Sequence, residues 1–327
     1  MLDKRRKAVT ILTAFLGVGV LLGAAWWGFF ALKPYALTPE EMSVLYAHGA
    51  HDARDTLVHP GAPQRIVVGT TPAWATPLLF TSFDGAPVVG RVVYPTDPRQ
   101  RADTGGRWPV LIALHAMGRT ERRWWEAEFK GRPTVESTHL LAERALKAGY
   151  AVVALDARAH GVRKDPVRPL VAHELLLDLH VWGEREPYER LIVETVKDYR
   201  VLLDWIERQP QFDASAVRAA GYSMGAQMAL LLAAVDPRVR SVAAMVPPHV
   251  DAKVAAVSPL TVTPQLAEVE VWLLTANDDG HAAAADNAAL FAALPGAPKR
   301  HLTFDGGHVL PATYVDRLQP WLRAPAP

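Results

Sequence analysis

Continuous apolar runs alternate with amphipathic stretches along most of the chain. Runs such as residues 108–114 and 150–155 are typical of strands covered on both faces. Residues 192–208 repeat apolar positions at helical spacing, which predicts an amphipathic helix. Further predicted strands are 78–82, 88–94, 217–222, 242–246, 269–275 and 301–304, and further predicted helices are 138–148, 224–234, 282–294 and 312–322. The alternation predicts an α/β fold with a mostly parallel central sheet and helices on both faces.

Two segments depart from this alternation. Residues 34–75 are rich in proline breaks and predict a connecting segment, with one short helix capped at Thr38 and Glu41. Residues 158–190 mix apolar and charged side chains, and we expect them to form a lid-like excursion over the site. The predicted catalytic domain therefore spans residues 76–327.

The first 33 residues have the pattern of a membrane-targeting segment. A cationic cluster, Lys4 to Lys7, precedes a stretch from Ala8 to Leu32 that carries no charge. At about 1.5 Å per helical residue, this stretch exceeds the roughly 30 Å of a bilayer core. It predicts either a retained anchor, which its length favours, or a cleaved signal peptide ending near Gly23-Ala24-Ala25. Either alternative places the catalytic domain outside the cytoplasm, periplasmic or extracellular, and secreted if cleavage occurs.

Composition narrows the function classes. The chain has 327 residues, enough for one large core, and a net charge of +1 with both signs mixed along it. A balanced surface without basic blocks argues against a nucleic-acid partner. Cysteine is absent, which excludes disulfides, thiolate metal sites and a cysteine nucleophile.

The sharpest local motif is Gly221-Tyr222-Ser223-Met224-Gly225. It follows a predicted strand and begins an apolar helix, the context that a nucleophile elbow requires. Glycines on both sides let the strand and helix backbones approach closely, and the helix N-terminus supplies N–H groups for an oxyanion. The alternative is that Ser223 simply caps the helix.

A second motif, Phe304-Asp305-Gly306-Gly307-His308, follows the last predicted strand. A general base has to reach the nucleophile from a short loop, and paired glycines suit such a loop. His308 therefore becomes the candidate base, rather than one of the other histidines in the chain.

Asp278 and Asp279 follow the apolar strand at 269–275. A buried carboxylate is needed to orient the imidazole, and only one of the two can provide it. The order serine, aspartate, histidine along the chain is typical of one large hydrolase family. The other aspartate of the pair is expected in a surface turn.

A fourth motif, His115-Ala116-Met117-Gly118, follows the strand at 108–114. A loop at this position can supply a second oxyanion N–H group beside that of Met224. His115 itself is expected to be structural rather than an acid or base.

Together these motifs resemble the α/β-hydrolase superfamily, and most of all its dienelactone hydrolase and esterase branch, from about residue 76 to residue 323. The resemblance implies the α/β-hydrolase fold, Ser223 as nucleophile, His308 as base and oxyanion donors at Met117 and Met224. It also implies Asp279 as the acid, with Asp278 as the alternative. The segment Asp156-Ala157-Arg158-Ala159-His160-Gly161 matches a part of the family that is mainly structural.

The chain also departs from that branch. Dienelactone hydrolases use a cysteine nucleophile, and the family loop usually reads His-Gly where this chain has His115-Ala116. The second difference leaves the choice between Met117 and Ala116 open.

The expected reaction is hydrolysis of a small carboxylic ester through an acyl-enzyme, without a cofactor or metal. Two alternatives remain from the sequence. One is a serine peptidase or amidase on the same scaffold, and the other is a non-catalytic, membrane-tethered binding protein.

Overall fold

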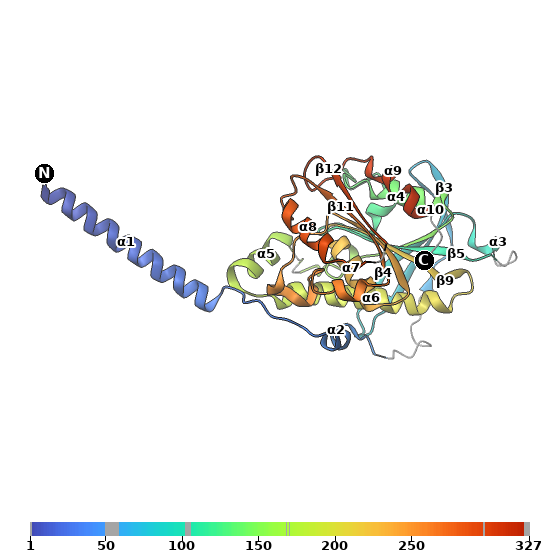
Figure 1. Cartoon of the computed structure of the whole chain (residues 1–327). Coiled ribbons are helices and arrows are strands. Elements are labelled where there is room, and N and C mark those ends of the chain that lie inside the picture. Colours follow the sequence, from blue (N-terminus) through green and yellow to red (C-terminus); the bar gives the residue numbers. More distant parts are fainter. Residues whose placement is uncertain are drawn as a thin grey trace.

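The structure is a computed structural model of the chain (Figure 1). It describes residues 2–49, 59–101, 106–167, 169, 171–296 and 298–323.

A ten-stranded sheet forms the centre of the described structure, in the order β1-β3-β4-β8-β5-β9-β10-β11-β12, with β2 paired to β3. Its strands are β1 (His59–Pro60), β2 (Gln64–Val68), β3 (Thr71–Thr81), β4 (Pro87–Tyr94), β5 (Trp108–Leu114), β8 (Ala151–Leu155), β9 (Phe212–Tyr222), β10 (Val239–Met245), β11 (Glu270–Ala276) and β12 (Lys299–Phe304). The six strands β8, β5, β9, β10, β11 and β12 run parallel to one another, whereas β4 pairs antiparallel with β8. The carboxyl ends of the parallel strands therefore meet at one edge, where ligands of such sheets bind.

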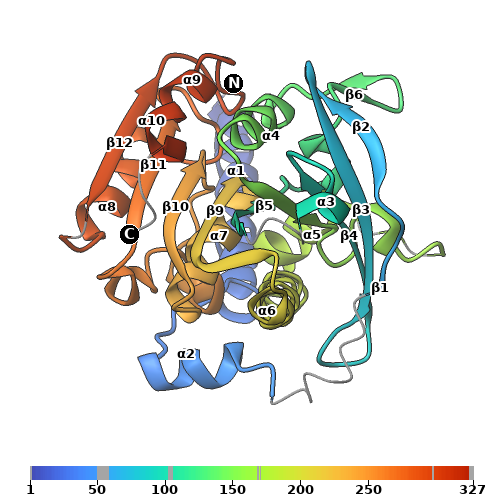
Figure 2. The ribbon, with the colours of Figure 1, turned by 90° about the vertical axis from the view of Figure 1, so that its right-hand side faces the viewer.

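Helices cover both faces of this sheet, as Figure 2 shows along the strands. The helices of one face are α4 (Thr138–Lys147), α9 (Tyr314–Arg317) and α10 (Gln319–Arg323), and those of the other are α2 (Pro39–Tyr46), α6 (Glu186–Arg208) and α7 (Met224–Val235). Along β5, Val110 and Ile112 pack into one core cluster while Leu111 and Ala113 pack into the other. This two-sided burial explains the unbroken apolar run, and each fully buried large apolar side chain stabilises the fold by roughly 1.5–3 kcal/mol.

The sheet begins earlier than the sequence pattern predicts. Residues 59–75, expected to be connecting chain, instead contribute β1, β2 and the start of β3. Pairing with β3 supplies the backbone partners of β2, although its side chains are mostly exposed and carry little periodic signal. The short helix expected near Thr38 is present as α2, and its capping box is formed between Thr38 and Glu41.

The excursion is more ordered than its composition suggests. It contains α5 (Ala172–Leu177) and one turn of π-helix (Asp178–Trp182), and α6 already begins at Glu186 instead of residue 192. The described residues also form two further helices, α3 (Pro98–Arg101) and α8 (Ala284–Ala293). A separate two-stranded ribbon consists of β6 (Glu128–Phe129) and β7 (Arg132–Pro133).

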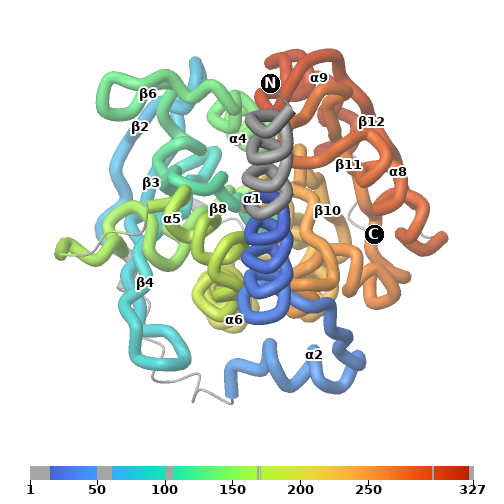
Figure 3. Tube along the Cα trace, turned by 90° about the vertical axis from the view of Figure 1, so that its left-hand side faces the viewer, coloured from blue at the N-terminus to red at the C-terminus, as the bar shows by residue number. Residues whose placement is uncertain are grey.

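The N-terminal helix α1 (Leu2–Phe29) projects from the side of the molecule that carries α5 (Figures 1 and 3). Its end is fixed to the excursion, because the Trp26 indole donates a hydrogen bond of 2.7 Å to the carbonyl of Val181 and Phe30 packs against Trp182. Among the helices of the described residues, none combines the length and apolar character that crossing a membrane requires. The membrane anchor at residues 1–33 stays a prediction from the sequence.

Candidate active site

The backbone of Ser223 turns sharply between β9 and α7. Its φ of 55° and ψ of −119° are unusual for a residue with a side chain. A Cβ on Gly221 would lie 2.0 Å from the carbonyl oxygen of Gly225, and one on Gly225 would lie 2.1 Å from that of Leu114. Both glycines of the Gly-x-Ser-x-Gly motif are thus required by close backbone approach, as the elbow interpretation predicts.

Three predicted side chains form one hydrogen-bonded chain at this turn. The Oγ of Ser223 lies 2.8 Å from Nε2 of His308. On the other side of the ring, Nδ1 of His308 lies 3.0 Å from each carboxylate oxygen of Asp279. This geometry lets Nδ1–H donate to the carboxylate and leaves Nε2 to accept the Ser223 proton.

The two neighbouring aspartates occupy different environments. The Asp279 side chain is only 1% exposed and faces His308. Asp278 is exposed, and its backbone N–H donates to the carbonyl of Gly306 at 3.0 Å. The structure therefore brings Asp279 to the site and leaves Asp278 in the surface turn.

Tyr222 and His281 also contact the site, although neither was singled out from the sequence. The Tyr222 hydroxyl donates to the carbonyl of His308 at 2.9 Å and accepts from the N–H of Leu310 at 2.8 Å, so it holds the loop that carries the imidazole. His281 donates its backbone N–H to Asp279 at 2.8 Å, and its ring packs edge-on against His308. Tyr222 could have been found from its place inside the motif, whereas nothing in the sequence distinguishes His281.

The loop after β5 lies beside the elbow, where Gly225 packs against the carbonyl of Leu114. Met224 is the first residue of α7, and Met117 is half-buried in the loop. The carbonyl of Ala116 is occupied by hydrogen bonds from Nδ1 of His115 at 2.8 Å and from the N–H of Arg119 at 3.1 Å. These two hydrogen bonds hold the loop in place. The assignment of the Met117 N–H group as an oxyanion donor stays a prediction.

His115 fixes this loop to the segment after β8. Its Nε2 accepts a hydrogen bond of 3.0 Å from the N–H of Ala157. Burial lowers the pKa of both His115 and His160 to about 4, so both rings are neutral near neutral pH. Asp156 accepts from the backbone N–H groups of Glu121 and Val162. These contacts agree with the structural role expected for His115, Asp156 and His160.

Two adjoining cavities lie next to the hydrogen-bonded chain, on the side of β10 and β11. The larger, about 300 Å³, is lined by Gly280 and His281 from the Asp279 loop and by Leu176 and Leu179 from the excursion. The excursion thus lies over a cavity that adjoins the site.

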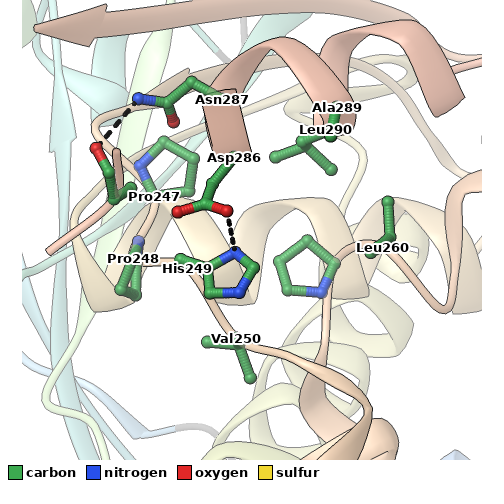
Figure 4. A pocket seen from close by; sticks show the side chains of 11 residues that line it. Pro247, Pro248, His249, Val250, Leu260, Asp286, Asn287, Ala289 and Leu290 are labelled. Carbon is green, nitrogen blue, oxygen red and sulfur yellow. Dashed lines mark hydrogen bonds and ion pairs between the residues drawn. The ribbon is translucent and has the colours of Figure 1, made fainter. Parts of the chain in front are cut away.

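The smaller cavity, about 40 Å³, shares Pro248, His249 and Val250 with the larger one. Figure 4 shows it between the loop after β10 and α8, with Leu290 contributing an apolar wall and the His249 ring facing Asp286 at 3.6 Å. The loop after β10 is also close to the nucleophile, because the N–H of Ser223 donates to the carbonyl of Met245 at 2.8 Å.

Comparisons with known proteins agree with this geometry. Residues 109–295 match the model of the family described as alpha/beta hydrolase fold. Acetyl xylan esterase 1 from Thermoanaerobacterium sp. JW/SL YS485 is similar in structure, with a TM-score of 0.61 and 16% identity over 89% of this chain and 96% of that one.

An acetyl xylan esterase from Paenibacillus sp. R4 gives the same values, a TM-score of 0.61 and 16% identity over 89% and 96% of the two chains. A cold-adapted esterase from an Arctic intertidal metagenomic library has a TM-score of 0.57 and 19% identity over 80% of this chain and 97% of that one. No curated protein matches the sequence significantly.

Proposed function

Because the chain belongs to the alpha/beta hydrolase fold family, we propose that it is a serine hydrolase that cleaves carboxylic esters through an acyl-enzyme. The observation that carries this proposal is the contact of 2.8 Å between Ser223 Oγ and His308 Nε2, with Asp279 behind the ring. The similar solved structures that are named as esterases support an ester as the bond cleaved.

The first half-reaction forms a bond between Ser223 and the substrate. The Ser223 oxygen attacks the ester carbonyl carbon while Nε2 of His308 takes the hydroxyl proton, and the carbonyl electron pair moves to its oxygen. Backbone N–H groups at Met224 and Met117 bind this oxyanion. The imidazolium is stabilised by Asp279 and then gives its proton to the leaving alcohol, which departs as the carbonyl reforms.

The second half-reaction repeats these steps with water. His308 removes a proton from water, the hydroxide attacks the acyl carbon, and the protonated imidazole returns a proton to Ser223 as the acid leaves. The cavity of about 300 Å³ is lined by Gly280 and His281, which directly follow Asp279 in the chain. We infer that this cavity receives part of the substrate.

A substrate panel tests the bond specificity. We expect p-nitrophenyl acetate and butyrate to be hydrolysed by the wild type and not by Ser223→Ala. The matching p-nitroanilides test the amidase alternative, and turnover of the anilides alone would overturn the esterase proposal. No turnover and no labelling by a fluorophosphonate would favour the non-catalytic alternative.

We also propose export of the catalytic domain, on sequence grounds alone. Support comes from the cationic residues Lys4 to Lys7 before the uncharged stretch from Ala8 to Leu32. Fractionation of cells that express the chain with a C-terminal tag tests this, and intact-mass analysis reports whether residues up to about Ala25 are removed. Tagged protein found only in the cytoplasm would contradict export.

A further inference from the structure

A third and larger cavity lies on the opposite side of the site, next to β4 and β8. Its volume is about 730 Å³. It begins at Gly118 and Arg119, which directly follow Met117 in the loop after β5, and it extends to Asp156 at the end of β8. Its near end therefore adjoins the proposed oxyanion loop, and we infer that a substrate held at Ser223 can extend into it.

The lining of this cavity is strongly cationic. Seven of its 17 lining residues are lysine or arginine and two are acidic. The cations come from β4 (Arg91), the segment after β5 (Arg119, Arg122, Arg123), the β6–β7 ribbon (Lys130, Arg132) and the excursion (Lys164). We call this cavity the cationic cleft. A concave surface lined by one sign of charge concentrates its potential on a ligand of opposite sign.

Both acidic residues of the cleft interact with neighbouring groups of the protein. The two Asp156 oxygens accept backbone N–H groups at 2.9 Å each. Glu121 lies 3.6 Å from Arg91 and also accepts from the Trp125 indole. Burial raises the pKa of Glu121 to about 7, so its carboxyl is about half protonated near pH 7 and offsets only part of the positive charge.

Several of the cations have no carboxylate partner. Among the described residues, no carboxylate lies within 4.0 Å of a charged nitrogen of Lys130, Arg132 or Lys164, all of which are exposed. Arg123 is only 6% exposed, and it donates hydrogen bonds to the carbonyl of Arg132 and the hydroxyl of Thr134. The carboxylates of Glu126 and Glu136 act on its charge without forming an ion pair within 4.0 Å. An anion in the cleft would give this buried guanidinium a counter-ion in direct contact.

The ribbon holds two of these cations in place. Lys130 and Gly131 both have positive φ, 51° and 68°, as in a tight hairpin turn. The turn is joined to the rest of the cleft because Arg123 donates to the carbonyl of Arg132 at 2.7 Å. Phe129 packs beneath Arg122, Arg123 and Lys130, at 4.9–5.8 Å from its ring centre.

We propose that the cationic cleft binds an anionic group of the substrate, a carboxylate or a phosphate, while the ester lies at Ser223. This inference rests on the proposed ester hydrolysis and adds the charge of the substrate to it. Arginine and lysine are the side chains that bind such groups by charge-assisted hydrogen bonds. The two cavities beside His281 are left for the uncharged part of the molecule.

The kinetic test compares esters that differ only in charge. One pair, 4-acetoxybenzoate and its methyl ester, varies the alcohol side, and a second, the p-nitrophenyl monoester of glutarate and p-nitrophenyl pentanoate, varies the acyl side. We expect Lys130→Gln/Arg132→Gln to lower the anionic-to-neutral ratio of kcat/KM by roughly tenfold for at least one pair. Salt should lower the same ratio in the wild type, since exposed charges are screened.

Arg240→Gln is the matched control, because Arg240 is an exposed cation near the start of β10, far along the sheet from the cleft. It should leave both ratios unchanged, and thermal unfolding should show that all variants are folded. Ratios that are unchanged in the double variant for both pairs would overturn the proposal.

A binding measurement separates this inference from the hydrolytic proposal. Calorimetry with citrate on Ser223→Ala protein at low salt needs no turnover. Citrate binding that the Lys130→Gln/Arg132→Gln changes weaken by roughly tenfold supports the cleft even if no ester is hydrolysed. Citrate binding that these changes leave intact, or no binding at all, contradicts it.

Discussion

Ser223 combines a half-buried reactive position with a backbone conformation that few residues adopt. Its φ of 55° and ψ of −119° fall in a sparsely populated region, which costs of order 1–3 kcal/mol. The cost is offset by the burial of α7, which packs against β9 and β10 on one face of the sheet. The sequence motif was sufficient to predict this residue, because only a strand, a tight turn and a helix explain both flanking glycines.

The acid of the hydrogen-bonded chain can be tested by exchanging neighbours. We predict that Asp279→Asn lowers kcat by roughly 10³- to 10⁴-fold, because the amide no longer holds the imidazole in the required tautomer. Asp278→Asn should change kcat by less than about threefold, since its side chain is exposed and the ring nitrogens of His308 bind Asp279 and Ser223 instead. Steady-state kinetics on p-nitrophenyl butyrate measure both, and the reverse ranking would move the acid to Asp278.

His115 should make the protein less stable in acid. Burial lowers its pKa to about 4 from an ordinary 6.5. Between these pH values the unfolded chain binds a proton that the folded chain does not, so stability falls as the pH drops from 6.5 towards 4. We predict that His115→Gln reduces this slope by about 1 kcal/mol per pH unit.

Urea unfolding of wild type and variant from pH 7 to pH 4.5 measures that difference. His160 contributes in the same direction and Glu121, with its pKa raised to about 7, in the opposite one, but both are common to the two proteins. His173→Gln, at an exposed position, is the control. Parallel stability curves for wild type and His115→Gln would show that the ring is not kept neutral by the fold.

At the scale of elements, the contact between α7 and β5 sets the geometry of the elbow. A methyl group on Gly225 would lie 2.1 Å from the carbonyl oxygen of Leu114. We predict that Gly225→Ala destabilises the protein by more than about 3 kcal/mol or prevents folding, because both backbones are fixed. Gly296→Ala is the control, because no atom lies within 4 Å of the added carbon. Its free energy of unfolding should differ from that of the wild type by less than about 0.5 kcal/mol. If thermal unfolding shows that Gly225→Ala is as stable as Gly296→Ala, the close approach of α7 to β5 does not require a glycine at position 225.

Element prediction succeeded where burial dictates the pattern. Strand β5 and helix α7 are buried almost throughout, so their residues had to be apolar in a recognisable run. The ribbon of β6 and β7 and the strand β2 escaped prediction because their residues are mostly exposed, so that burial imposes little apolar pattern on them.

At the scale of the whole molecule, the site lies between two adjoining cavities on one side and the cationic cleft on the other. Apolar side chains such as Leu179 and Val250 occur on one side, and the cationic cleft lies on the other. The sequence could identify Ser223 and His308 because each stands in a motif. It could not identify the cleft, since its cations come from four separate segments that only the fold brings together.

Labelling with an active-site probe shows most directly whether the Ser223 hydroxyl is an activated nucleophile. The folded protein is incubated with a fluorophosphonate and analysed by intact mass and peptide mapping, beside Ser223→Ala and His308→Ala. We predict one stoichiometric adduct on Ser223, no adduct in Ser223→Ala, and labelling slowed by roughly 10³-fold or more in His308→Ala. An unlabelled wild type, or an adduct on another residue, would contradict the assignment of Ser223 as an activated nucleophile.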